Sequence, residues 1–153
     1  YYGDTRRDCL CGAHEIARYK KKVSGPILDR IDLQVMVPHV GLADLSDAPI
    51  LHSQQGDGGT KSVRETVVRV RAVQTKRQGM LNSALSSKQV SEGITLDLPA
   101  KAFFEKVWKS AALSARGYYR MLKVARTIAD IEGVLAVAER HVAEAFAYRL
   151  REK

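Results

Sequence analysis

Residues 114–133, which read SARGYYRMLKVARTIADIEG, give the clearest structural signal in the chain. Ser114 suits a helix N-cap because its hydroxyl can accept a hydrogen bond from a backbone N–H of the first turn. Gly133 suits the left-handed conformation that often ends a helix. Between them, apolar side chains recur at helical spacing, at Tyr118, Met121, Leu122, Ala125 and Ile128. The stretch therefore predicts an amphipathic helix with one buried face.

Four other segments show the same helical periodicity. The first helix is expected to start at a capping box of Ser62 and Glu65, and the second at Ser86 or Ser87. Asp97 followed by Pro99 indicates the start of the third, and the fourth begins at about Ala138. The faces expected to be buried are Val63, Val67, Val70 and Val73; Phe103, Phe104, Val107 and Trp108; and Val142, Ala145, Phe146 and Leu150. Amphipathic helices of this kind can close a common core. We therefore predict a helical bundle over residues 61–153.

The N-terminal part has a different character. Residues 31–37, IDLQVMV, alternate loosely and are rich in β-branched side chains, so they predict a strand that ends at Pro38. A single strand cannot pair its own backbone, and the chain starts at Tyr1 without an initiator Met. We therefore expect a mainly α chain in which residues 1–40 are a fragment of a larger α/β domain. The turn-rich residues 41–60 are expected to be a linker to the bundle.

The composition is that of a soluble globular protein with a basic surface. Hydrophobic residues make up 45% and charged residues 27% of the chain, and no apolar stretch is long enough to cross a membrane. Lys and Arg number 25 against 17 Asp and Glu, which gives a formal net charge of +8. This excess favours polyanionic partners such as nucleic acid or nucleotide phosphate, although charge alone fits a merely soluble basic surface equally well.

Cys9 and Cys11 are the only cysteines. Because one residue separates them, a disulfide would close a strained ring and is not expected, and unbridged thiols indicate the reducing cytosol. Together with His14 they supply three candidate zinc ligands, but a tetrahedral site needs four and no convincing fourth is nearby. We therefore predict free thiols and no metal site in this chain. Cys9 and Cys11 are the candidate ligands if a metal does bind.

Residues 56–62, GDGGTKS, resemble a phosphate-binding loop only superficially. Such a loop needs Gly directly before Lys and a strand ahead of it, so that consecutive backbone N–H groups cradle the phosphates. Here Thr60 intervenes and no strand precedes the segment. The sequence also lacks an apolar run that ends in paired acids able to hold magnesium. A linker that leads into a helix cap is the better interpretation.

The most specific motif lies in residues 19–33, YKKKVSGPILDRIDL. A loop that ends in LDRID directly before a strand resembles the arginine-finger region of AAA+ ATPases, and with GD at 3–4 and CLC at 9–11 it is similar to the magnesium-chelatase-like ComM (YifB) family. Further blocks match that family in order, at residues 62–64, 77–79, 82, 85–86, 113–120, 124–130 and 141–145. The upstream half of the family's cysteine cluster is absent, so zinc binding is not carried over.

The resemblance implies a helical AAA+ lid over residues 61–153 and roles for three arginines. Arg30 would be the arginine finger, which stabilises the charge on the γ-phosphate of a neighbouring subunit's ATP. Arg116 would be the sensor-2 arginine, which reaches the phosphates bound by its own core domain, with Arg126 as second choice. Taken alone, Arg30 could instead be a surface arginine paired with Asp29 or Asp32.

The resemblance further implies an ATP- and magnesium-dependent motor that assembles with identical subunits into a ring, a hexamer in our prediction. Its partner would be DNA, during branch migration in natural transformation and recombination. Two alternatives remain open: the ATPase subunit of a metal-inserting magnesium chelatase, and a non-enzymatic nucleic-acid-binding helical module. Because the nucleotide-binding core is expected elsewhere, we predict that this chain alone has no ATPase activity.

Overall fold

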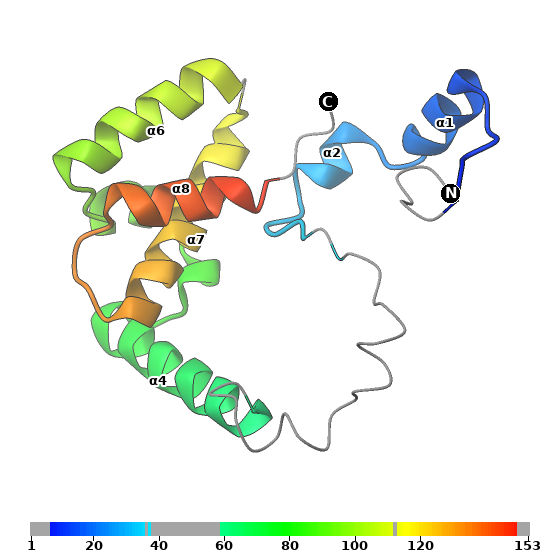
Figure 1. Cartoon of the computed structure of the whole chain (residues 1–153). Coiled ribbons are helices and arrows are strands. Elements are labelled where there is room, and N and C mark those ends of the chain that lie inside the picture. The colour runs from blue at the N-terminus through cyan, green and yellow to red at the C-terminus, as the bar shows by residue number, and fades with distance from the viewer. Residues whose placement is uncertain (1–6, 36, 38–58, 112, 150–153) are drawn as a thin grey trace. The chain divides into compact units, whose positions relative to one another are not determined.

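The structure is a computed structural model that describes residues 7–35, 37, 59–111 and 113–149. Its contacts divide the chain into two compact units, Tyr1–Ile31 and Asp32–Lys153. The mainly α fold is confirmed: Figure 1 shows helices in both units, and the described residues form no sheet. None of the described helices combines the length and apolar character needed to cross a membrane.

The first unit contains two short helices, α1 (Ala13–Lys20) and α2 (Gly25–Leu28). The start of α1 is closed by the backbone N–H of Gly12, which donates to Glu15 Oε2 at 2.9 Å. Helix α2 carries Pro26 in its first turn, where the fixed φ of proline favours helix and its missing N–H costs nothing. No residue of either helix is buried.

The second unit is a helical bundle. Its elements are α4 (Thr60–Gln78), the 3₁₀ helix η1 (Asn82–Ala84), α5 (Ser87–Gly93), α6 (Leu98–Ala111), α7 (Ala115–Glu132) and α8 (Glu139–Ala147). All five helices expected from periodicity therefore form. Helix α7 begins after Ser114, whose Oγ accepts from the Gly117 N–H at 3.0 Å, and it ends at Gly133 with φ of 78°. Both predicted boundaries of α7 are confirmed.

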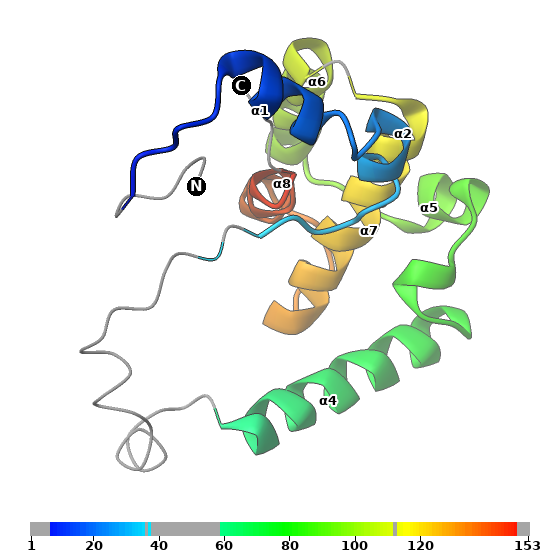
Figure 2. The ribbon, with the colours of Figure 1, turned by 90° about the vertical axis from the view of Figure 1, so that its right-hand side faces the viewer.

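The core lies between α6, α7 and α8. Helix α8 packs against both α7 and α6, and Figures 1 and 2 show α4 and α6 on opposite sides of α7. The fully buried side chains include Met121, Ala125, Val142 and Val137. Val137 forms an isolated bridge with Leu96, which ties the segment before α8 to the segment before α6.

Helix α4 differs in detail from its prediction. It begins at Thr60 with Gly59 as N-cap, so Ser62 lies inside the helix and does not cap it. Of the four valines expected on a buried face only Val70 is buried, whereas Val63 and Val67 are 56% and 47% exposed and Val73 is exposed too. The reason is that α7 is the main neighbour of α4, so most of the surface of α4 faces solvent.

Three further expectations met different outcomes. Trp108, expected to be buried, is 41% exposed, and its ring makes an edge contact with Tyr118. The strand predicted over 31–37 does not form at residues 31–35 or 37, because a strand requires a neighbouring strand to accept its backbone hydrogen bonds. Instead Gln34 donates its N–H to the Tyr148 carbonyl at 2.7 Å. Leu150 and most of the predicted linker lie outside the described residues.

Candidate functional site

Arg30 stands just after α2, on an exposed turn. The turn is closed by its backbone N–H, which donates to the Ile27 carbonyl at 2.9 Å. Its side chain bends back so that Nη1 donates to the Pro26 carbonyl at 2.6 Å. No ion pair involves Arg30 within the described ranges, so the surface pairing with Asp29 or Asp32 that the sequence left open is not formed there. Most of its five donors remain available to another molecule.

Arg116 lies in the first turn of α7 and is exposed. In the described part of the chain it makes neither a hydrogen bond nor an ion pair. A positive side chain is unfavourable at the N-terminal end of a helix, because the helix dipole is positive there. The fold therefore gives no stabilising reason for Arg116, and its guanidinium is accessible for an anionic ligand.

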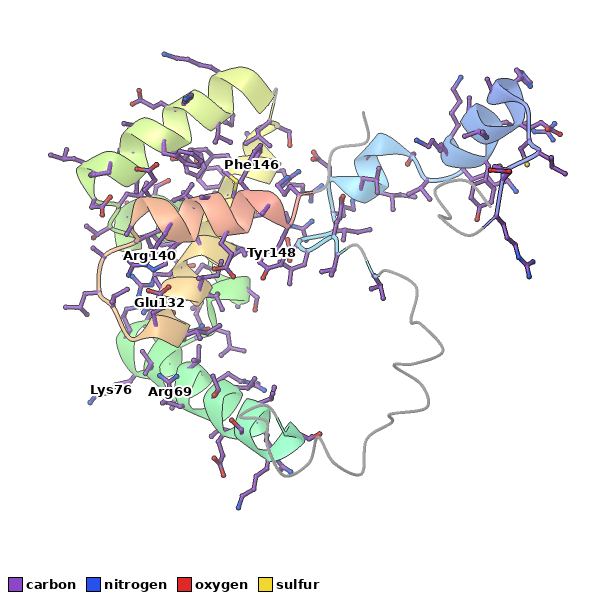
Figure 3. The ribbon with its side chains drawn as sticks, in the orientation of Figure 1. Arg69, Lys76, Glu132, Arg140, Phe146 and Tyr148 are labelled. Carbon is purple, nitrogen blue, oxygen red and sulfur yellow. The ribbon has the colours of Figure 1, made fainter. Side chains whose placement is uncertain are left out.

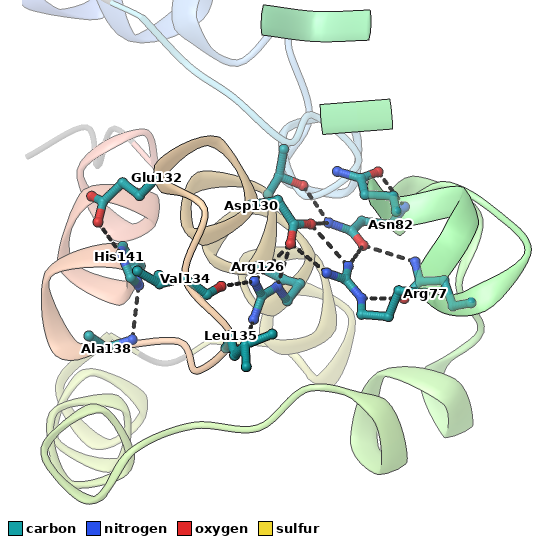
Figure 4. Close-up of polar contacts among 12 residues, drawn as sticks. Arg77, Asn82, Arg126, Asp130, Glu132, Val134, Leu135, Ala138 and His141 are labelled. Carbon is teal, nitrogen blue, oxygen red and sulfur yellow. Dashed lines mark hydrogen bonds and ion pairs between the residues drawn. The ribbon is translucent and has the colours of Figure 1, made fainter. Parts of the chain in front are cut away.

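Arg126 has the opposite environment, since only 4% of it is exposed. Its Nε and Nη2 donate to Asp130 Oδ1 at 3.0 and 2.7 Å, Nη2 donates to the Val134 carbonyl at 2.5 Å, and Nη1 donates to the Leu135 carbonyl. Four of its five donors are thus used inside the bundle (Figure 4). Arg126 fixes the loop after α7 against that helix.

Asp130 is the centre of this polar cluster, and it is 2% exposed. It accepts from Arg77 Nη1 and Nη2 at 2.5 and 3.0 Å and from Asn82 Nδ2 at 2.9 Å, in addition to Arg126. Burial alone raises the pKa of Asp130, but the hydrogen bonds from Arg77, Asn82 and Arg126 outweigh burial and hold that pKa below its ordinary value. We call Arg77, Asn82, Arg126 and Asp130 the Asp130 cluster.

The Asp130 cluster joins elements far apart in the sequence. Arg77 comes from the end of α4 and Asn82 from η1, 53 and 48 positions before Asp130 on α7. The backbone N–H of Asn82 donates to Gln74 Oε1 at 3.0 Å, and Asn82 Nδ2 also donates to Thr127 Oγ1 at 3.0 Å. Sequence reasoning did not assign these residues a structural role, although residues 77, 82 and 130 lie in the blocks that carried the resemblance.

A second polar group closes the end of α7 against α8. Glu132 Oε2 accepts from Arg140 Nη2 at 2.7 Å and contacts His141 Nε2 at 2.9 Å (Figures 3 and 4). Because His141 Nδ1 accepts from the Ala138 N–H, Nε2 carries the proton and donates to Glu132. The hydrogen bonds from Arg140 and then His141 lower the pKa of Glu132 to about 2. Glu132 is therefore ionised in the folded protein down to strongly acidic pH.

Neither Cys9 nor Cys11 forms a disulfide. A hydrogen bond from the Cys11 backbone lowers the pKa of Cys9, whereas the hydrogen bond and charge of Cys9 raise the pKa of Cys11. Across the ranges that the structure describes, no three His, Cys, Asp or Glu side chains gather as they would around a metal ion. Cys9 and Cys11 therefore interact with each other, and no group of three metal-binding side chains forms around them in the described part of the chain.

The comparisons with known proteins cover both units. Residues 58–149 match the family described as "Magnesium chelatase, subunit ChlI C-terminal", and residues 1–45 match "Magnesium chelatase, subunit ChlI". The chain belongs to the magnesium-chelatase-like AAA+ family. The match over residues 1–45 contains Arg30, and the match over residues 58–149 contains Arg116 and the whole Asp130 cluster. The family resemblance noted from the sequence is thus confirmed.

The relatives of this magnesium-chelatase-like chain are longer proteins. It is 40% identical over 137 residues to "Competence protein ComM" of Haemophilus influenzae, a match that covers 88% of the chain and 26% of ComM. It is 34% identical over 150 residues to "Uncharacterized protein YifB" of Escherichia coli, covering 97% of the chain and 28% of YifB. The YifB protein of Salmonella typhimurium is 33% identical over 149 residues, with 97% and 28% covered. The chain spans about a quarter of the length of these relatives.

Proposed function

We propose that this chain supplies the arginine finger and the helical lid of an ATP-hydrolysing ring motor that acts on DNA. The observation that carries the proposal is the exposed guanidinium of Arg30 on the turn after α2, which forms no ion pair within the described residues and uses one donor on the Pro26 carbonyl. Membership of the magnesium-chelatase-like AAA+ family supports it. The relative named as a competence protein supports a role in natural transformation, by branch migration of incoming DNA.

In this proposal Arg30 acts across a subunit boundary. Phosphoryl transfer spreads negative charge over the γ-phosphate oxygens, and a forked guanidinium donates to two of them at once. Arginine fingers accelerate hydrolysis by about 10³–10⁵ in the systems studied. The exposure of Arg30 and the availability of its donors suit contact with a neighbouring molecule. The nucleotide and its magnesium would be held mainly by the rest of the protein.

Arg116 would contact the nucleotide of its own subunit as sensor 2. Its exposure and its freedom from internal partners favour it over Arg126, whose donors are used by Asp130 and two carbonyl groups. Phosphate oxygens are suitable acceptors for such a guanidinium. Arg116 and Arg126 are ten positions apart on α7, so they do not act on the same group.

The test is Arg30→Ala in the protein expressed at its full length. ATP hydrolysis is expected to fall by about 10³ or more while ATP affinity stays nearly unchanged, because the finger contacts the transition state in trans. Arg18→Ala is the matched control, since Arg18 is an exposed arginine of α1 in the same unit. Equal loss of binding and hydrolysis would show that Arg30 has a folding role.

A mixing experiment separates action in trans from action within one subunit. Arg30→Ala subunits keep an intact nucleotide site, and subunits of a variant unable to bind ATP keep a normal Arg30. If Arg30 acts in trans, a mixed ring regains ATP hydrolysis wherever these two kinds of subunit are neighbours. If Arg30 serves its own subunit, mixtures stay as inactive as either variant.

A second candidate is the ATPase subunit of a metal-inserting chelatase, because both family descriptions name magnesium chelatase. The ATP-handling arginines would be the same in both functions, so they do not distinguish them. The molecule that stimulates ATP turnover distinguishes the two functions. Stimulation of the full-length ATPase by branched DNA supports the DNA motor, whereas stimulation only by a tetrapyrrole and its partner subunits supports the chelatase.

A further inference from the structure

Helix α4 carries a concentrated positive charge. Six of its nineteen residues are basic and one, Glu65, is acidic. All six basic residues are exposed, although the Arg77 side chain is partly buried against Asp130: Lys61, Arg64, Arg69, Arg71, Lys76 and Arg77. The helix therefore accounts for a large share of the chain's formal net charge of +8.

The basic side chains fall into two sets. Arg77 pairs with Asp130, and Arg69 Nη2 donates to the Ile131 carbonyl at 3.1 Å, so both are engaged with α7. The other four lie about 100–180° around the helix from the buried Val70, at 100° per residue. We call these four, Lys61, Arg64, Arg71 and Lys76, the basic face of α4. Figure 3 shows Lys76 extending away from the bundle.

The charge of the basic face is not neutralised by ion pairs in the described residues. None of its four side chains takes part in an ion pair there, and Glu65 is the one carboxylate that shares this side of the helix. Lys61 and Arg64, three positions apart, repel each other slightly, by a few tenths of a kcal/mol. Folding therefore does not explain why these positive charges lie together, whereas binding of a polyanion that neutralises them does.

We propose that the basic face of α4 binds the phosphate backbone of duplex DNA. The inference rests on the proposed DNA motor and adds a contact surface to it. Helix α4 is about 28 Å long, which is the length of about eight base pairs. Arg and Lys contacts to phosphate carry no sequence information, as a motor that moves along any sequence requires. Binding of this kind releases counterions and weakens as salt rises.

An anionic membrane is the other polyanionic surface that a basic helix could contact. Helices that bind membranes combine basic residues with Trp, Phe or Leu on the opposite face. Helix α4 contains none of these three residue types, and the side opposite its basic face carries Val70 and the Arg77 contact to α7. The lack of large apolar side chains that could insert into a bilayer favours DNA as the partner.

The experiment compares two triple variants of the full-length protein by fluorescence anisotropy with a labelled duplex over a range of salt concentrations. One variant carries Arg64→Gln, Arg71→Gln and Lys76→Gln in α4. The matched control carries Lys101→Gln, Lys106→Gln and Lys109→Gln, which remove the same charge from exposed positions of α6. Gln has nearly the helix propensity of Lys and Arg, so both helices are retained, as circular dichroism can verify.

The slope of log K against log salt is expected to become shallower by about 3 in the α4 variant, about one for each lost phosphate contact, and to stay unchanged in the α6 variant. Unchanged slopes in both variants, or equal changes in both, would overturn the inference. So would α4-dependent binding to phosphatidylglycerol vesicles with an unchanged DNA slope. If the unmodified protein binds no DNA at all, the proposed motor fails as well.

Discussion

The replacement Asp130→Asn tests whether the Asp130 cluster holds the bundle together. In the folded protein Oδ1 accepts three hydrogen bonds from Arg77 and Arg126, and Oδ2 accepts two from Arg77 and Asn82. Asn has nearly the same shape but only one oxygen. At best it keeps the three bonds at the Oδ1 position and directs its NH₂ group toward two other donors.

The loss extends beyond those two bonds, because Arg126 stays buried without its carboxylate. Removing one partner of a buried ion pair costs about 3–5 kcal/mol. For a unit the size of Asp32–Lys153, 1 kcal/mol lowers the melting temperature by about 4 °C, so a decrease of about 12 °C or more is expected. The pKa of Asp130 is lowered in the folded state, so its contribution to stability is complete above the unfolded pKa and is lost in acid.

Urea unfolding of the 153-residue chain measures this cost directly. Trp108 is the single tryptophan and packs against Tyr118 in the bundle, so its fluorescence reports on unfolding of that unit. Lys88→Gln is the control, because the Lys88–Glu92 pair is exposed and its ends are 4.0 Å apart. Such pairs contribute about 0.3–0.5 kcal/mol. If Asp130→Asn costs as little as the control, the cluster does not stabilise the bundle as we argue.

Two smaller predictions concern the end of α7. The folded pKa of Glu132 is about 2, below its usual unfolded value of about 4.3, so wild-type stability should fall as pH drops through this interval. The urea midpoint of Glu132→Gln should fall less over the same interval. Identical pH profiles of the two proteins would contradict the assignment. Gly133→Ala should cost about 1–2 kcal/mol by the same urea assay because φ is 78°. The control Gly93→Ala, with open space at its Cβ and no positive φ, should be neutral or slightly stabilising; equal effects would refute the strain argument.

The ends of α7 could be predicted because their causes are local. The Ser114 hydroxyl caps a backbone N–H three residues away, and Gly133 supplies a conformation that other residues rarely adopt. The periodic apolar residues between them then define the buried face. The same reasoning placed all five helices of the bundle. Local chemistry therefore accounts for which segments are helical.

The partners of each helix face could not be predicted in this way. Periodicity marks Val63 and Val67 as one apolar side of α4, but it does not say whether another element covers them, and both are exposed. Arg126 raised the opposite difficulty. Its burial depends on Asp130, which in turn depends on groups from α4 and η1 about fifty positions away. Such long-range pairing is not visible in a local pattern.

The Asp130 cluster also has a mechanical consequence. Helix α7 has 18 residues and is about 27 Å long, with Arg116 in its first turn and Asp130 near its last. The cluster and the Glu132 contacts attach that far end to α4, η1 and α8. We therefore expect a displacement of the first turn of α7 to carry α4 with it, because the helix is stiff and its other end, about 21 Å along the axis at 1.5 Å per residue, is bonded to α4.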